Sequence, residues 1–126
     1  MSKIVQAVNA MISNPEKITS IIKGRETSEN EYFFLYKNKY KWSVAQVDID
    51  EYNIFYYVDN MSLAEIEQIS RNNWKTLNFV TYKTSEIRTK EAFESFSELY
   101  RVVSEKAFGL DEMFNDIISD MDDLPF

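Results

Sequence analysis

One apolar stripe between residues 89 and 109 constrains the fold most. Its members recur every three or four positions behind a capping residue, Thr89, and the stripe ends near Gly109, as expected for one long helix. The stripe consists of Ala92, Phe93, Phe96, Leu99, Tyr100, Val103 and Ala107. Because such a helix buries only one face, the rest of the chain must supply an apolar surface for it to pack on.

Residues 32–58 predict that surface. Their composition shifts to aromatic and β-branched residues, and turn residues at 38–39 and 50–51 divide them into three strands of a meander. The in-out alternation changes parity after Val44, which indicates a bulge or a strand with two apolar sides. Residues 74–82 predict a fourth strand.

Two short helices are predicted at the N-terminus. The first follows a Ser2 cap, and the second follows Pro15, which suits the first helical position, and ends near Gly24. Their apolar positions are Ile4, Val5, Val8, Met11 and Ile12, then Ile18, Ile21 and Ile22. A further helix is predicted at Ser62, whose spacing from Glu65 matches a capping box.

The composition fits one domain. A chain of 126 residues with 44% apolar content can bury one core, and no apolar run is long enough to cross a bilayer, so no membrane contact is expected. The N-terminus lacks the features of a signal peptide, which favours the cytoplasm. We predict an α+β domain over residues 1–118, with two N-terminal helices, an antiparallel sheet of about four strands and a long C-terminal helix. A disordered acidic tail is predicted at residues 119–126.

The absence of certain residue types argues against an enzyme. Without His or Cys the chain has no histidine base, cysteine nucleophile, common zinc site or disulfide. Two glycines leave little room for a phosphate-binding loop. The pair Asp48 and Asp50 could bind Mg²⁺, but such acids are more often solvated. We therefore expect a non-enzymatic protein without a cofactor or metal.

The acidity of the chain is concentrated at its C-terminus. The net charge is −7, and residues 111–126 hold six acids and no base. The other 15 of the 21 acids nearly balance the 14 bases, so the remainder of the chain has a charge of only −1. Such asymmetry often marks an interaction segment.

The last residues combine the features of a docking peptide. Phe126 carries an aromatic ring and the free α-carboxylate, Pro125 stiffens the approach, and Asp122 and Asp123 lie just behind. A partner with an apolar pocket, an Arg or Lys for the carboxylate and a basic rim would bind such a peptide. The alternative is a solvated terminus, or a Phe126 that folds back onto its own core.

The sequence ISDMDDLPF at residues 118–126 resembles the C-terminal tip of bacterial single-stranded DNA-binding proteins, in the form typical of low-GC Gram-positive bacteria. In that family the tip docks on the primosomal helicase, RecQ-type helicases and the recombination mediator RecO. The resemblance implies that Phe126 is the anchor, while Met121 interrupts the acidic run and implies a weaker affinity. The docking residues that it implies are Asp120, Asp122, Asp123, Leu124, Pro125 and Phe126. It is confined to the tip, because the OB-fold and long linker of the family are not found.

Two stretches interleave bases with aromatic rings, as binding sites for single-stranded nucleic acid do. One spans residues 36–42, and the other, residues 71–90, holds five bases against one acid. The alternative is that the rings belong to the core and the lysines to a solvated sheet face. The candidate residues are Lys37, Lys39, Lys41, Trp42, Arg71, Trp74, Lys75, Tyr82, Lys83 and Arg88.

The resemblance of the tip implies an accessory protein of DNA replication or recombination, and we expect it to be encoded by a phage or another mobile element. Its tail would dock on replication and repair proteins, while the rest of the chain binds single-stranded DNA or serves an element-encoded polymerase or primase. The alternative is an inhibitor or decoy that competes with the host single-stranded DNA-binding protein for its partners. A third hypothesis is an unrelated interaction domain with an inert tail.

Overall fold

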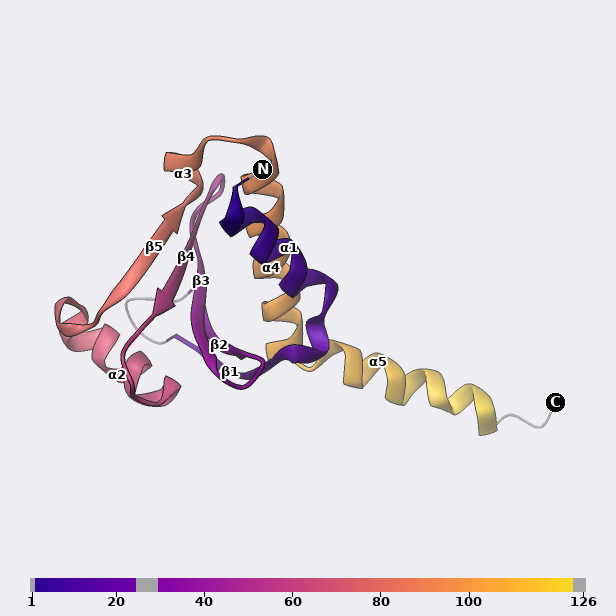
Figure 1. Cartoon of the computed structure of the whole chain (residues 1–126). Helices are drawn as coiled ribbons and strands as arrows, with labels where there is room; N and C mark the ends of the chain where they lie inside the picture. The colour runs from indigo at the N-terminus through magenta and orange to yellow at the C-terminus, as the bar shows by residue number, and fades with distance from the viewer. Residues whose placement is uncertain (1, 25–29, 124–126) are drawn as a thin grey trace.

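The chain forms a five-stranded antiparallel sheet with helices on both faces (Figure 1). The computed structural model describes residues 2–24 and 30–123, except for the side chains of residues 70–74 and 122–123. The N-terminal half contains α1 (Lys3–Ser13), η1 (Pro15–Lys17), β1 (Ile18–Lys23), β2 (Glu31–Tyr36), β3 (Tyr40–Asp48) and β4 (Glu51–Tyr57). The C-terminal half contains α2 (Leu63–Asn73), η2 (Trp74–Thr76), β5 (Phe79–Lys83), α3 (Thr84–Ile87), α4 (Lys90–Ala107), α5 (Leu110–Ser119) and η3 (Asp120–Asp123). The predicted α+β class is confirmed.

The sheet is a meander in the order β1-β2-β3-β4-β5, so each strand pairs with the next in sequence. Between β2 and β3, Lys37 and Asn38 both have positive φ, 57° and 59°, as the central residues of a type I′ hairpin turn require. The register between β3 and β4 shifts between Gln46 and Asp48. The three-strand meander and its predicted bulge are therefore confirmed.

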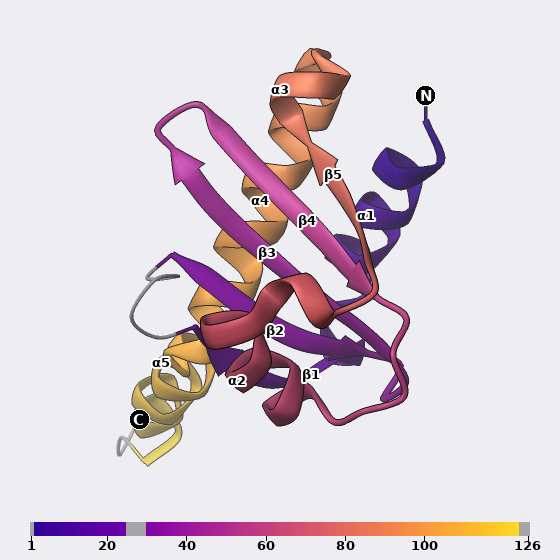
Figure 2. The same ribbon diagram turned by 90° about the vertical axis from the view of Figure 1, so that its left-hand side faces the viewer.

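The two faces of the sheet have separate cores. On one face, Phe96 and Leu99 of α4 and Val8 of α1 pack against alternate residues of the strands, among them Phe34. On the other face, Ile66 of α2 packs against residues of the opposite parity. Figure 2 shows α2 in front of the sheet and α4 behind it. A sheet covered on both sides explains why its strands are rich in apolar residues at both parities.

Polar side chains fix the starts of three helices as the sequence predicted. Ser2 accepts a hydrogen bond from the Val5 amide, and Thr89 accepts one from the Ala92 amide at 3.1 Å. At the start of α2, Ser62 accepts from the Glu65 amide and its own amide donates to the Glu65 carboxylate, which completes the capping box.

The second N-terminal helix is shorter than predicted. Only the 3-10 turn η1 follows Asn14, and the isoleucines beyond it form strand β1. A bulge explains the difference: Ser20 has a φ of 56°, and the β1–β2 register shifts between Thr19 and Ile22. The extra residue places Ile18 and Ile21 against the same core, so a strand acquires the three-residue spacing of a helix.

Two other predicted boundaries differ from the structure. The strand predicted from residue 74 begins at Phe79, after the 3-10 turn η2. At the other end, helical backbone does not stop before residue 119 but continues through η3 to Asp123. Residues 124–126 of the predicted docking tip lie outside the described residues. Within the described part of the chain, no helix is both long and apolar enough to span a lipid bilayer.

Candidate functional site

The lysines at 37, 39 and 41 do not share one face of a strand. Lys37 and Lys39 are exposed on the β2–β3 turn, and the Lys39 ammonium lies 4.7 Å from the centre of the Tyr40 ring. Lys41 is in β3, where its ammonium donates hydrogen bonds to the carbonyl oxygens of Asp59 and Met61. Lys41 therefore holds the chain after β4, and it does not share one solvated face with Lys37 and Lys39.

The bases predicted at residues 71–90 are dispersed along the molecule. Lys75 lies in η2, at the α2 end of β5, whereas Lys83 ends β5 and Arg88 caps α3 at the other end (Figure 1). The Arg88 guanidinium donates to the Ser85 carbonyl of its own turn at 3.1 Å. The side chains of Arg71 and Trp74 are not among those that the structure describes. The described bases of this stretch therefore do not line one groove.

An apolar pocket between α1 and the sheet brings three of the candidate residues together. It encloses about 380 Å³ and is formed by one helix, the β2–β3 turn and four strands. Its lining consists of Ala7, Ala10, Met11, Tyr36, Lys37, Tyr40, Trp42, Tyr56 and Tyr82. Of the sequence-predicted residues it contains Lys37, Trp42 and Tyr82, whereas Tyr36, Tyr40 and Tyr56 were not predicted.

The sheet register explains why these rings gather. Trp42 pairs with Tyr56 on the neighbouring strand, and their ring centroids lie 4.8 Å apart at an interplanar angle of 52°. Tyr36 pairs with Tyr40 across the hairpin, which brings Lys37 to the pocket edge. Helix α1 lines this space with the small, exposed side chains of Ala7 and Ala10 and with the buried Met11. The pocket thus combines aromatic walls with one lysine.

This arrangement suits a flat ring attached to an anionic group. Rings and apolar side chains provide a stacking surface, and Lys37 offers a cation at the edge. An unstacked nucleobase with its phosphate has this chemistry. An aromatic side chain beside a carboxylate has it too, so the pocket alone does not select between the two.

A buried polar cluster on the other face of the sheet was not predicted from the sequence. Ser43 donates to the Glu31 carboxylate at 2.6 Å and lies 2.8 Å from the Tyr57 hydroxyl. Because Ser43 has one proton to donate, the Tyr57 hydroxyl donates to it. Burial raises the pKa of the Tyr57 hydroxyl, and the charge of Glu31 adds to the rise. The cluster links three strands, and we interpret it as structural.

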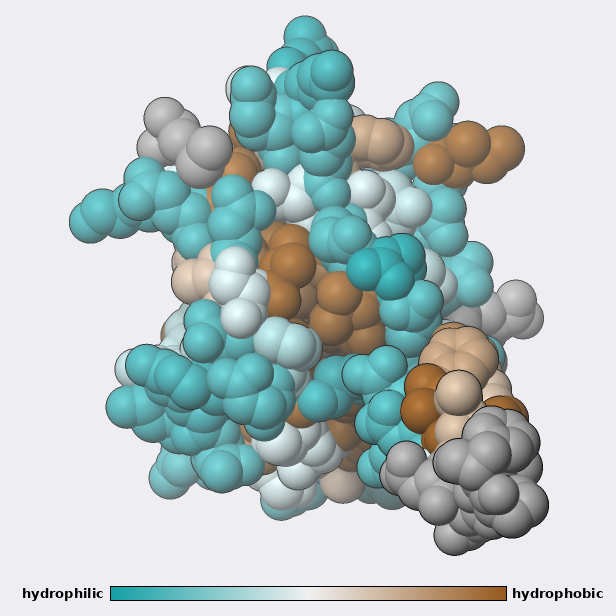
Figure 3. All heavy atoms as spheres, turned by 90° about the vertical axis from the view of Figure 1, so that its right-hand side faces the viewer, coloured by the Kyte–Doolittle hydropathy of each residue, from teal (hydrophilic) through white to brown (hydrophobic). Residues whose placement is uncertain are grey.

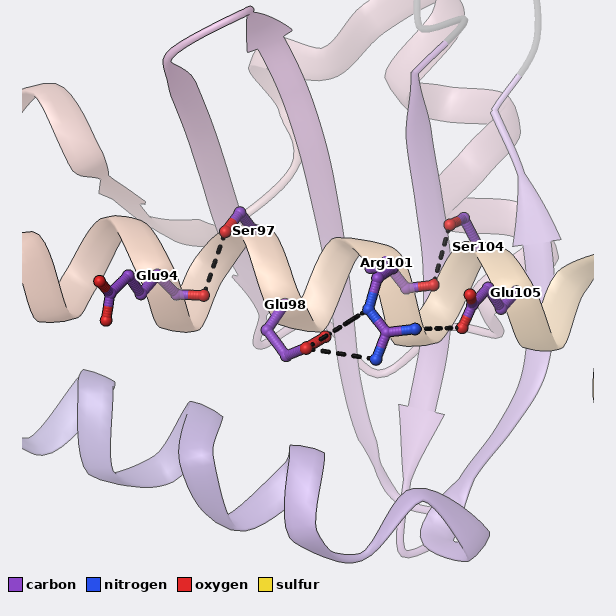
Figure 4. A network of polar contacts seen from close by, with 6 residues as sticks. All are labelled: Glu94, Ser97, Glu98, Arg101, Ser104 and Glu105. Atoms are coloured by element: carbon purple, nitrogen blue, oxygen red, sulfur yellow. Dashed lines mark hydrogen bonds and ion pairs between the residues drawn. The ribbon is translucent and has the colours of Figure 1, made fainter.

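The outer face of α4 carries a local ion-pair network. Arg101 bonds Glu98 through its Nε and Glu105 through its Nη1, and the two acids lie one turn away on either side (Figure 4). Its hydrogen bond with Glu98 is the main cause that raises the pKa of Arg101. Ser97 and Ser104 donate to carbonyls of the same helix. The Arg101 guanidinium therefore pairs with acids of its own helix rather than offering a site for an anionic ligand.

The predicted acidic segment is carried away from the sheet. Helix α5 leaves the end of α4 at Gly109, whose φ of 67° is easily adopted by glycine, and the far end of α5 lies remote from the strands (Figure 1). Asp120 is exposed in η3, which also contains the backbone of Asp122 and Asp123. Of the implied docking residues, the structure thus describes only the start of the segment.

The carboxylates of the described residues do not form a metal site: no three of them are grouped to hold an ion. Asp48 and Asp50 are exposed at the β3–β4 turn, where Asp48 accepts a hydrogen bond from the Ile49 amide. Comparison with protein-family models, with curated proteins and with solved structures finds no match to this chain.

Proposed function

We propose that this protein is a non-enzymatic accessory factor of DNA replication or recombination that acts in the cytoplasm and docks on replication and repair proteins through its C-terminal segment. The observation that supports the proposal is the direction of α5, which points away from the folded sheet (Figure 1). The sequence continues from this helix as an acidic stretch without a base that ends in DDLPF. A peptide that follows such a helix can enter a partner's pocket while the sheet and the helices packed on it stay folded.

The charge distribution supports the same proposal. Residues 111–126 hold six acids, so this segment would be attracted to the basic docking surfaces of helicases and recombination mediators. The binding would weaken with salt. The remainder of the chain is almost neutral and would add little steering of its own.

The aromatic pocket supports a role of the body in holding single-stranded DNA. Its rings can stack an unpaired base, and Lys37 and Lys39 are exposed on the β2–β3 turn beside it, where they can meet a phosphate. In this version the body holds a nucleotide while the tail recruits the enzyme. The origin of the protein in a phage or other mobile element belongs to the same proposal.

One observation favours the alternative, an inhibitor or decoy that competes with the host single-stranded DNA-binding protein. The predicted basic stretch is divided between the two ends of β5, and Lys41 is bonded to backbone carbonyls. A body without a continuous basic groove among its described residues fits a decoy better than a strong DNA-binding protein.

Binding of three chains to a RecQ-type helicase and to a primosomal helicase tests the tail. These are the parent chain, a chain without residues 124–126, and a chain with one alanine added after Phe126. The proposal predicts that both changes abolish helicase binding, because the anchor and its carboxylate must be free at the terminus. Unchanged binding by either variant would show that the tail is inert.

The same chains with oligo-dT separate the accessory protein from the decoy. The Trp74→Phe background leaves Trp42 as the fluorescent reporter inside the pocket, since the chain has two tryptophans. Quenching of Trp42 that falls with salt and with Lys37→Glu indicates DNA in the pocket. Helicase binding without any quenching indicates the decoy.

A further inference from the structure

Helix α5 carries an apolar stripe that the described residues leave uncovered. Its members recur at three- and four-residue intervals and lie on one side of the helix, because successive residues advance by about 100°. They are Met113 (41% exposed), Phe114 (51%), Ile117 (57%), Ile118 (58%) and Met121 (68%). Figure 3 shows these apolar residues gathered on α5 at the lower right, apart from the apolar patch at the centre of that view.

Acidic residues border this stripe on both sides. By helical position, Asp111 lies beside Ile118 on one edge, and Asp116 and Asp120 lie toward Met113 on the other. All three acids are exposed, and the segment from residue 111 onward contains no base. The surface is therefore an apolar strip between two negative margins.

The charge pattern identifies the kind of partner. Two copies of α5 packed stripe to stripe would bring acids against acids along both margins, which opposes self-association. A groove with an apolar floor and Lys or Arg along its walls complements every feature of the helix. The stripe precedes the DDLPF tip directly, so one partner can contact both.

We propose that the apolar stripe of α5 is a second docking element, which lies in a basic-walled apolar groove of the same replication protein that binds the tip. This inference rests on the proposed function, since it takes the tail-binding helicase as the partner. The helix covers about 15 Å, at roughly 1.5 Å per residue, which is long enough to fill a helix-binding groove. Binding of the helix would fix the position from which the tip reaches its pocket.

A matched set of isoleucine substitutions in the full chain tests the inference. The double variant Ile117→Gln, Ile118→Gln removes two of the five apolar side chains of the stripe and keeps the helix, because glutamine is a good helix former. Ile49→Gln is the control, since Ile49 is 79% exposed on the β3–β4 turn. We expect the double variant to weaken binding to a RecQ-type or primosomal helicase about tenfold or more, and the control to leave it unchanged.

The tip deletion separates the two proposals. If deleting residues 124–126 abolishes helicase binding while the double variant binds like the parent, the helix inference fails and the tail proposal stands. If the double variant abolishes binding while the tip deletion does not, the tail proposal fails, and the stripe is a docking element that acts without the tip. A parent chain that binds neither helicase overturns both.

Sedimentation of the parent chain tests whether the stripe packs instead on a second copy of the chain. The inference predicts a monomer whose mass is unchanged by the double variant. A dimer that the double variant dissociates, with helicase binding retained, would show that the stripe meets a second copy and would overturn the inference.

Discussion

Helices α4 and α5 follow each other in the chain and have the same kind of apolar stripe, yet one stripe is buried and the other is exposed. In α4, Phe96, Leu99 and Val103 are fully buried against the sheet. In α5, Phe114 and Ile117 remain more than half exposed. The difference does not lie in periodicity, because both helices are strongly amphipathic; it lies in what the chain places beneath each stripe.

The polar faces of the two helices differ as well. The outer face of α4 mixes signs and pairs them locally, as Arg101 does with Glu98 and Glu105 (Figure 4). The charged residues of α5 are all acids. Balanced charge suits a helix that remains on its own domain, whereas unbalanced charge bordering an uncovered stripe suits a helix that meets another molecule.

The largest effect on stability is expected for a substitution in the buried stripe of α4. Phe96→Ala removes a fully buried ring between α4 and the sheet. We expect the free energy of unfolding to fall by about 3–5 kcal/mol, from the lost transfer energy and the cavity. Urea unfolding followed by tryptophan fluorescence measures this. A loss below about 1 kcal/mol would mean that α4 is not the core helix.

The buried hydroxyl of Tyr57 gives the body a pH response that α5 cannot have, because residues 110–126 contain no tyrosine. Its raised pKa keeps Tyr57 protonated in the folded chain, while the unfolded chain ionises near pH 10. Stability from this group is thus present below about pH 10 and lost as the pH rises above it.

Replacement of Tyr57 isolates that response. Tyr57→Phe should cost about 1 kcal/mol at neutral pH, because a buried hydrogen bond to Ser43 is lost. It should also reduce the fall in the urea midpoint between about pH 8 and pH 11. Parallel curves for the parent and the variant would show that Tyr57 ionises as an ordinary tyrosine.

The junction between the two helices should matter less than the buried ring of Phe96. Gly109 has a φ of 67°, and an added Cβ would meet no atom within 4 Å, so Gly109→Ala adds only backbone strain. We expect a loss of at most about 1–2 kcal/mol, or less if α5 reorients to relieve the strain. Differential scanning calorimetry measures the change. A larger loss would show that α5 is held rigidly against the body.

The smallest effect is expected for the phenylalanine on α5. Phe114→Ala matches the change made at Phe96 but removes a ring that is 51% exposed. The free energy of unfolding should change by no more than about 0.5 kcal/mol. A loss comparable to that of Phe96→Ala would show that the stripe of α5 is covered in solution by another part of the chain or by a second copy.

Local signals predicted much of the fold. The caps at Ser2, Ser62 and Thr89, the turns of the meander and the long helix were all readable because each depends on a few neighbouring residues. Strand β1 was not, since its bulge at Ser20 gives isoleucines the spacing of a helix. The error arose where one residue of irregular backbone changed the period of the pattern.

The candidate sites depend on long-range pairing, so the sequence predicted them only in part. Trp42 and Tyr82 were recognised beside basic residues, but Tyr36 and Tyr56 join them only through the register of three strands. Lys41 was misplaced because its role depends on carbonyls from the segment after β4. The exposure of α5 likewise follows from tertiary structure, since periodicity does not reveal what covers a helix.

The most direct test of docking through the C-terminal residues is an NMR titration of the isotope-labelled full chain with an unlabelled RecQ-type helicase. We expect amide signals from residues 110–126 to shift or broaden first, while those at the centre of α4, such as Leu99, keep their positions. Perturbations confined to the aromatic pocket, with the signals of α5 unchanged, would contradict the claim that the C-terminal arm is the docking element.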